Sequence, residues 1–390
     1  MSAPTLSVRT RPPGPVASAA FVSSFDRFAV SPVLVLVATD LGASLAQALA
    51  VASGYFLAYG LCQPLWGVLS DRFGRVRLMQ AMLIAGAVTG TLSALAPSLG
   101  VLVAARTLTG AFFGAITPTS LTYLGDTVGD AHRQSALSDL MAAVALGTAL
   151  ATAVAGLLGD LAGWRLVFAV PPVLALGCAF ALRRVPEPRH ELRHGLTTRM
   201  REAVRNRWVL VVVSLALVEG GVVLGVLTLL APALQSQGVD AATAGLATAA
   251  YGVSVILATR VVKALAGRVQ MPGLMAIGGT AVAVGYAAVA VHVSVTTVIT
   301  AALLLGVTWA FLHSSLQTLA TSLLPHARGA VVSLFAASLF TGSSLGSWAA
   351  GPLGEHGQWA LLFGVTAAVS LLLTVAAVLA GHAYRTRTRA

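Results

Sequence analysis

Charged residues are scarce in this sequence. They make up 9% of its 390 residues, whereas hydrophobic residues make up 57%. A soluble domain carries roughly 25% charged residues, so the composition excludes an ordinary soluble protein. A membrane-spanning helix needs about 20 mostly apolar residues, and a chain of this length with short loops has room for about twelve. The composition therefore predicts an all-α polytopic membrane protein.

Cysteine is nearly absent as well. Cys62 and Cys178 stand alone in apolar runs, and two isolated cysteines build neither a disulfide framework nor a metal site. The sequence also lacks a His/Cys cluster with metal-ligand spacing, a nucleotide-binding glycine loop with its lysine, and a nucleophile beside a base. We therefore expect no enzyme activity, no cofactor and no metal, and an energy source other than ATP.

Acidic residues are outnumbered by basic ones, 13 against 24, and the formal net charge is +11. A strongly basic balance can indicate a nucleic-acid partner. Here, however, every basic residue except Arg27, Arg106, Arg165 and Arg260 falls in a tail or loop that we assign to one side of a membrane. This positive-inside pattern predicts cytoplasmic termini and argues against nucleic acid. The preference for arginine over lysine is typical of a GC-rich bacterial gene, so we expect the bacterial cytoplasmic membrane.

The apolar runs fall into two groups of six, joined by the longest hydrophilic stretch of the chain. Basic segments beside an anionic leaflet attract lipid headgroups, so we expect this stretch to contact lipid. We predict a disordered cytoplasmic tail at 1–16, an N-terminal six-helix bundle at 17–182, a basic cytoplasmic linker at 183–207, a C-terminal six-helix bundle at 208–381 and a cytoplasmic tail at 382–390.

The polar stretch between the second and third apolar runs is the most informative part of the sequence. Gly74 can take a backbone conformation closed to other residues, and Asp71 can pair with a nearby arginine. An ordinary basic turn between two membrane helices is the alternative interpretation. The stretch reads G-V-L-S-D-R-F-G-R-V-R, and its glycines, acid and arginines are Gly67, Asp71, Arg72, Gly74, Arg75 and Arg77.

The spacing G-x-x-x-D-R-x-G-R-x-R resembles the signature of the loop between spans 2 and 3 in the major facilitator superfamily. Arg106 and Gly110 are similar to the R-x-x-x-G motif of span 4, and Asp26 with Pro32 is similar to span 1 of the twelve-span drug:proton antiporters. The resemblance covers essentially the whole chain. It implies twelve transmembrane helices in two pseudo-symmetric six-helix bundles, with substrate bound between them near the bilayer midplane.

One segment departs from the antiporter pattern. Drug antiporters carry a G-P-x-x-G-G stretch in span 5, whereas residues 151–156 of this chain read A-T-A-V-A-G. The missing proline favours an importer over an antiporter and does not argue against transport.

Ionisable residues inside the spans are expected to be functional, because a charge at the bilayer centre costs about 2.5–3.5 kcal/mol on insertion scales. Asp26 lies about 14 Å along span 1, where it can relay a proton or form a structural pair with Arg27 or Arg106. Glu219 is also near mid-depth, and we expect it to be unpartnered, neutral and available for a proton or cation. Arg106 resembles the arginine near the proton site of family members, where it would stabilise a neighbouring carboxylate.

Six residues are expected to line a substrate cavity. Tyr55 and Tyr251 occupy equivalent places in the two halves, eleven residues after Ser44 and Asp240. His313 has an ordinary packing role as its alternative interpretation, and Arg27 could instead reach toward the membrane interface. The full set is Arg27, Tyr55, Tyr251, Trp309, His313 and Gln317.

These residues together suggest a secondary active transporter that works by alternating access. We hypothesise a monomer that exports small drug-like or metabolite compounds against protons, with a small-molecule substrate, protons and membrane lipids as its partners. Asp26 and Glu219 would titrate beside Arg106, and the motif between spans 2 and 3 would latch the cytoplasmic side, together with Asp126. A proton symporter or facilitator that imports a metabolite and a membrane sensor that transports nothing are the alternatives.

Overall fold

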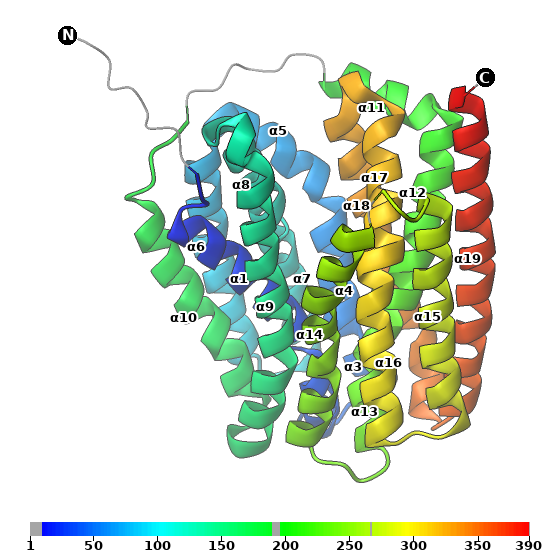
Figure 1. The fold of residues 1–390 in the computed structure, drawn as a ribbon. Helices are drawn as coiled ribbons and strands as arrows, with labels where there is room; N and C mark the ends of the chain where they lie inside the picture. Colours follow the sequence, from blue (N-terminus) through cyan, green and yellow to red (C-terminus); the bar gives the residue numbers. More distant parts are fainter. Residues whose placement is uncertain (1–9, 189–195, 266, 390) are drawn as a thin grey trace.

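The computed structural model describes residues 10–188, 196–265 and 267–389, which are almost entirely helical. Figure 1 shows the helices in two groups that stand side by side. The N-terminal half consists of α1 (Gly14–Phe28), η1 (Ser31–Val33), α2 (Leu34–Asp40), α3 (Leu45–Ala48), α4 (Ala50–Leu61), α5 (Gln63–Phe73), α6 (Arg75–Ala94), α7 (Leu99–Phe113), α8 (Ile116–Thr127), α9 (Asp130–Ala162) and α10 (Trp164–Leu182).

The C-terminal half follows a short helix, α11 (Leu196–Arg205). It consists of α12 (Arg207–Glu219), η2 (Gly220–Gly225), η3 (Val226–Leu229), α13 (Leu230–Gln235), α14 (Ala241–Leu265), α15 (Met271–Val291), α16 (Val295–Thr308), η4 (Trp309–His313), α17 (Ser314–Leu323), η5 (Pro325–Ala327), α18 (Arg328–Glu355) and α19 (Trp359–Arg389).

The helices divide into the twelve spans that the sequence predicts. Within the described residues, 11 continuous stretches are long and apolar enough to cross a membrane, and the pair Leu45–Leu61 and Gln63–Phe73, bent by 48°, supplies the twelfth. Six spans lie on each side of α11, so the fold of two six-helix bundles is confirmed. The bend in the second span has a local cause, because Pro64 lies in the first turn of α5, where its ring and missing N–H interrupt the preceding helix.

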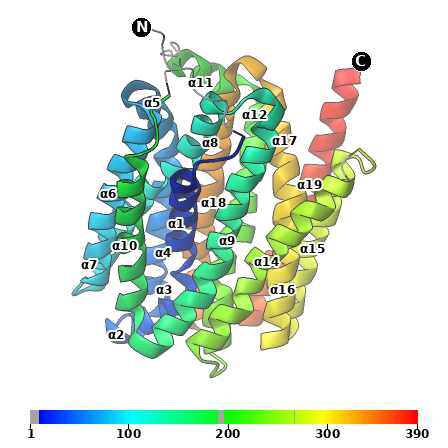
Figure 2. The ribbon, with the colours of Figure 1, turned by 60° about the vertical axis from the view of Figure 1, so that its left-hand side comes forward.

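Different helices lie at the two ends of the molecule. Figure 1 shows α5, α8 and α11 at the end where α19 finishes, which we call the terminal end, and α3 and α13 at the opposite end, which we call the distal end. Figure 2 shows α9 of one half and α14 of the other running side by side along the boundary between the halves.

Three further spans are irregular near their middle. In the first span, α1 ends at Phe28 and η1 begins at Ser31, because Pro32 cannot donate a helical hydrogen bond. The seventh and tenth spans each contain a π-helical turn, η2 and η4. Such turns occur frequently at functional sites because they rotate the residues beside them out of the regular helical register.

Both ends of the helical part differ from the predicted boundaries. Helix α1 begins at Gly14 instead of residue 17, because Pro15 lies in its first turn, where a proline costs no hydrogen bond. Residues 1–9 of the predicted disordered tail lie outside the described residues. Helix α19 continues beyond residue 381, where Tyr384 packs edge-on against Trp208 and Arg385 donates to Gln270 over 2.5 Å.

The predicted linker at 183–207 contains the helix α11. Its apolar residues recur at helical spacing, and Met200 and Ala203 pack against the C-terminal half. Glu202, on another face, lies 2.7 Å from His326 of η5. The linker is therefore partly an amphipathic helix bound to the terminal end of the second half. Residues 189–195, which carry two of its eight arginines, lie outside the described residues.

The hydrogen bonds between the two halves lie mainly toward the distal end. Of the hydrogen bonds between halves in the described ranges, four lie on the distal side of the molecule and one lies at the terminal end. The distal bonds are Ser31 to the Thr228 carbonyl at 2.9 Å, Gln235 to the Pro32 carbonyl at 2.7 Å, Ser53 with Ser347 at 2.8 Å and Ser44 to Glu355 at 2.9 Å; the terminal bond is Lys263 to Ser138 at 3.1 Å.

Glycines allow the closest approaches between helices. A Cβ at Gly220 would lie 1.7 Å from the Leu339 carbonyl oxygen, so the seventh and eleventh spans can meet only with glycine there. Between the halves, a Cβ at Gly156 would lie 2.3 Å from the Ala241 carbonyl oxygen. The span 5 segment that departs from the antiporter pattern therefore still lies in close contact with α14.

We predict that Gly220→Ala destabilises the C-terminal half. The added methyl group must displace the α18 backbone, and overpacking of this kind costs about 1–3 kcal/mol. Gly364→Ala is the matched control, because nothing lies within 4 Å of a Cβ at that position of α19. The measurement is the apparent Tm of the purified protein in detergent. Equal Tm values for the two variants would contradict the packing described here.

Candidate functional site

Asp26 and Arg106 form a buried ion pair in the N-terminal half. Asp26 lies in the last turns of α1 and Arg106 in the middle of α7, and each side chain is 1% exposed. Arg106 donates to Asp26 Oδ1 over 2.7 Å and to the Asp26 carbonyl oxygen over 3.0 Å. Its guanidinium also lies over the rings of Tyr55 and Phe168, 4.6 and 4.8 Å from their centres. We considered Arg27 and Arg106 as possible partners of Asp26, and the structure pairs Asp26 with Arg106.

Glu219 and His313 form a second buried pair, in the C-terminal half. His313 Nδ1 lies 3.3 Å from Glu219 Oε2, and the side chains are 9% and 0% exposed. The expectation that Glu219 has no partner is therefore wrong. Glu219 directly precedes the π-helical turn η2, and His313 ends the π-helical turn η4, so both residues sit where the helix register changes. The Trp309 ring stacks on His313 at 3.7 Å, which holds the imidazole in place.

Each pair leaves one carboxylate oxygen without a partner. Asp26 Oδ2 and Glu219 Oε1 are buried and make no hydrogen bond within the described part of the chain. A buried oxygen of a charged group without a hydrogen bond is costly, whereas a protonated carboxyl carries no charge and can itself donate. Both oxygens are thus places where a proton could bind.

Arg27 lies next to Asp26 in sequence but faces another way. Its guanidinium lies 4.9, 5.0 and 5.3 Å from the ring centres of Phe28, Tyr59 and Phe340. Because Phe340 belongs to α18, Arg27 reaches across the boundary between the halves. Its hydrogen bond to Ser24 is long, at 3.4 Å, and no ion pair to Arg27 occurs in the described ranges.

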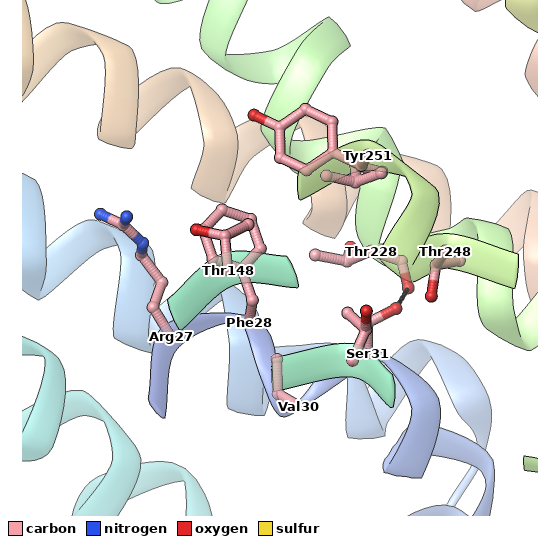
Figure 3. Close-up of a pocket in the computed structure, with 10 residues that line it drawn as sticks. Arg27, Phe28, Val30, Ser31, Thr148, Thr228, Thr248 and Tyr251 are labelled. Carbon is pink, nitrogen blue, oxygen red and sulfur yellow. Dashed lines mark hydrogen bonds between the residues drawn. The ribbon is translucent and has the colours of Figure 1, made fainter. Parts of the chain in front are cut away.

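A cavity lies beside Arg27 at the boundary between the halves. It leaves space for about one water molecule, so it is closed to anything larger in this state. Figure 3 shows Arg27 at one side of this cavity and the paired Ser31 and Thr228 at the other. The lining residues from the N-terminal half are Arg27, Phe28, Val30, Ser31, Thr148 and Thr152, and those from the C-terminal half are Leu227, Thr228, Thr248 and Tyr251.

The residues that we expected to line a substrate cavity lie in four different places. Arg27 and Tyr251 line the cavity just described. Tyr55 instead packs against Arg106, and Trp309 and His313 belong to the Glu219 pair. Gln317 is exposed on α17, away from these contacts. The sequence did not indicate the hydroxyl residues of the cavity, because isolated serines and threonines in apolar helices carry no distinctive spacing.

The polar stretch between the second and third spans builds a compact cluster at the terminal end. Arg75 is buried and pairs with Asp71 one helical turn away, with Asp126 of α8 at 3.1 Å and with the Ser70 hydroxyl at 2.6 Å. Gly74 separates α5 from α6 with φ of +100°, which favours glycine. The predicted contact between this stretch and Asp126 is thus present. Arg72 and Arg77 are exposed, and nothing lies within 4 Å of a Cβ at Gly67.

Glu187 completes this cluster, and no pattern in the sequence pointed to it. Its carboxylate accepts hydrogen bonds from the backbone N–H groups of Arg75, Val76 and Arg77, at 2.5, 3.0 and 3.0 Å. These are free donors at the start of α6, and a negative charge there is also favoured by the helix dipole. A Cβ at Gly74 would lie 2.7 Å from the Glu187 carboxyl carbon. Gly74 therefore provides room for Glu187 as well as the turn.

No site for a metal is assigned. Within the part of the chain that the structure describes, no three or more His, Cys, Asp or Glu side chains are grouped so that they could hold a metal ion.

Comparison with known proteins agrees with this architecture. The profile of the Major Facilitator Superfamily matches residues 16–336 and 221–389. A triacylglyceride transporter of Mycobacteroides abscessus is 31% identical over 177 residues, which are 44% of this chain and 34% of that protein. The multidrug efflux pump LfrA of Mycolicibacterium smegmatis is 35% identical over 175 residues, 43% of this chain and 33% of that protein. The chain thus matches about a third of the length of these two relatives.

A solved structure shows the same fold at low sequence identity. A bacterial homologue of the human lysosomal transporter Spinster, in an inward-facing and unoccupied conformation, has a TM-score of 0.76 and 17% identity, and the match covers 94% of this chain and 96% of that one. At this identity the likeness concerns the fold alone.

We predict that Glu187→Ala weakens the terminal end of the N-terminal half. The substitution leaves three N–H groups of α6 without their acceptor, and loss of a helix cap costs about 0.5–2 kcal/mol. Glu202→Ala is the control, because its pair with His326 is exposed and such pairs contribute about 0–1 kcal/mol. Thermal unfolding in detergent should show a larger decrease in Tm for Glu187→Ala. A decrease no larger than that of Glu202→Ala would contradict the capping role.

Proposed function

Because the chain belongs to the major facilitator superfamily, we propose that it is a secondary active transporter that exports small, partly apolar compounds in exchange for protons. Its two halves expose the cavity between them to each side of the membrane in turn. The relatives named as a triacylglyceride transporter and a multidrug efflux pump support an apolar cargo and the outward direction.

One observation carries the proposal of proton coupling. Each half holds one buried carboxylate, Asp26 or Glu219, that has one oxygen paired and the other oxygen without a partner. Charges inside the membrane are expensive and are retained where they pair or line an ion path. A buried pair with a free carboxylate oxygen fits a residue that alternates between an ionised and a protonated form.

The alternation follows from access to water. When the halves separate around a carboxylate, water solvates the ionised form, and when they close, the apolar surroundings favour the neutral form. Arg106 keeps its charge at physiological pH, so a proton on Asp26 weakens the pair that holds α1 to α7. Loss of the Glu219 charge likewise releases His313. One proton that moves inward down 100 mV supplies about 2.3 kcal/mol to drive the cycle.

The two ends of the molecule act as its gates. The distal hydrogen bonds between the halves seal that end in the present state. At the other end, the cluster of Arg75 with Asp71, Asp126 and Glu187 keeps the loop between the second and third spans in one conformation. We propose that this cluster latches the terminal side when the distal side opens.

Import by proton symport is the second candidate. The missing proline and glycines of residues 151–156 favour it, because a segment without them has a more regular helix. Against it, Gly156 still allows the backbone contact with α14, so the close approach between the halves does not require the proline. We therefore retain export as the preferred direction.

We predict that Asp26→Asn and Glu219→Gln each abolish or strongly reduce cargo-driven proton movement. The amides keep the size of the carboxyls but cannot gain or lose a proton. The measurement uses proteoliposomes that contain a pH-sensitive dye, with an imposed cargo gradient. Asp160→Asn, a carboxylate exposed near the end of α9, is the control and should couple like the wild type. Intact coupling in both Asp26→Asn and Glu219→Gln would contradict the proton assignment, and flux in the opposite direction would favour the importer.

We also propose that the terminal end faces the cytoplasm of a bacterium. Green fluorescent protein fused after the last residue should fluoresce in cells. Alkaline phosphatase inserted at Gly238, in the turn between α13 and α14, should be active only in the periplasm. The reverse result for both reporters would invert the orientation and, with it, the assignment of the gates.

A further inference from the structure

The charge that lines the cavity between the halves is positive. Among the described residues, its lining consists of one cation, Arg27, six hydroxyl residues and three apolar residues, without a carboxylate. Asp26, the acid nearest in sequence, points to Arg106 and is paired there. The group formed by Asp26, Arg27 and Arg106 therefore carries one net positive charge, and that charge faces the cavity.

Arg27 has hydrogen-bond donors that the surrounding residues do not use. Within the described part of the chain, its Nε is buried without a hydrogen-bond partner, and the one hydrogen bond of its guanidinium is the long contact to Ser24 at 3.4 Å. The three aromatic rings around it bind the cation through their faces, which is a weaker interaction than a charge-assisted hydrogen bond. A guanidinium with free donors in a fixed fork suits a carboxylate, which accepts two parallel hydrogen bonds.

A second unsatisfied polar group faces the same cavity. Thr152 is 7% exposed, and its Oγ1 is buried with no hydrogen-bond partner within the described part of the chain. It belongs to α9, whereas Arg27 belongs to α1, so two independent helices each bring an unpaired polar group to one small space. The neighbouring apolar surface comes from Phe28, Val30 and Leu227.

We propose that the cargo is an organic anion, a compound with a carboxylate on a partly apolar body, whose carboxylate pairs with Arg27. The hydroxyl of Thr152 hydrogen-bonds to a polar group of the cargo, and the apolar body packs against Phe28 and Leu227. A cationic cargo would bring a second positive charge beside Arg27, and a neutral one would leave the guanidinium unpaired. This inference rests on the proposed transport function and narrows it to one class of cargo.

The present size of the cavity bears on how the cargo enters. Room for about one water molecule is too little for any organic compound, so the anion must enter while the halves are further apart. Arg27 contacts Phe340 of the opposite half. A carboxylate bound to Arg27 would therefore lie at the boundary between the two halves. Its charge would there affect how tightly the halves associate.

The test compares three sets of matched compounds. Each set contains a carboxylate, its amide and the corresponding ammonium compound, on a benzene, naphthalene or cyclohexane body. Binding to the purified full-length chain in lipid nanodiscs is measured by tryptophan fluorescence at one pH. We expect at least one carboxylate to bind and to be preferred over its amide and ammonium counterparts by about tenfold or more, as for a hydrogen bond to a charged group.

The variants separate the role of Arg27 from a general effect on folding. Arg27→Gln should remove the preference for the carboxylate, and Arg27→Lys, which keeps the charge, should restore part of it. Thr152→Val should weaken binding of the preferred compound less than Arg27→Gln does. Arg165→Gln is the control, because Arg165 pairs with Asp40 on the exposed surface; it should bind like the wild type.

Three results would overturn the proposal: no carboxylate binds, the amide or ammonium compounds bind as tightly as the carboxylates, or Arg27→Gln keeps the carboxylate preference. None of these three results decides whether the protein transports cargo, which the assay of proton movement in proteoliposomes tests separately. Proton movement driven by a neutral or cationic cargo would support transport and reject the anion, whereas carboxylate binding without any proton movement would support this site and reject proton coupling.

Discussion

Charges in the apolar interior of this protein are tolerated because they are paired, and the pair of Asp26 with Arg106 is the clearest case. Two side chains that are 1% exposed meet at 2.7 Å and join the first span to the fourth. Neither charge is stable there alone. Arg106 therefore joins α7 to the last turns of α1, directly beside Arg27, which lines the cavity between the halves.

The C-terminal half also pairs its buried acid, but with a different kind of side chain. Its central acid, Glu219, has histidine instead of arginine as partner, at 3.3 Å. Histidine changes its charge within the physiological range of pH, and arginine does not. The two halves are therefore alike in architecture but differ in the partner of the central acid, which is arginine in one half and histidine in the other.

Much of the fold was predictable from the sequence, because hydropathy and charge asymmetry report on each span separately. The cluster at Arg75 was also predictable in part, since Asp71 and Arg75 are one helical turn apart. The Glu219–His313 pair was not, because the two residues are 94 positions apart and two π-helical turns bring them together. Glu187 was missed for a similar reason: its position in a basic linker suggested a solvated residue, and only the packed structure places it at the start of α6.

The central claim of our proposal is that the buried carboxylates Asp26 and Glu219 bind and release protons. Infrared difference spectroscopy of the purified protein, titrated between about pH 5 and 8, measures this directly through the C=O stretch of a protonated carboxyl. The account predicts a protonated-carboxyl band that grows as the pH falls and that is lost in Glu219→Gln or Asp26→Asn. A spectrum without such a band, or one whose band is unchanged in both variants, would contradict it.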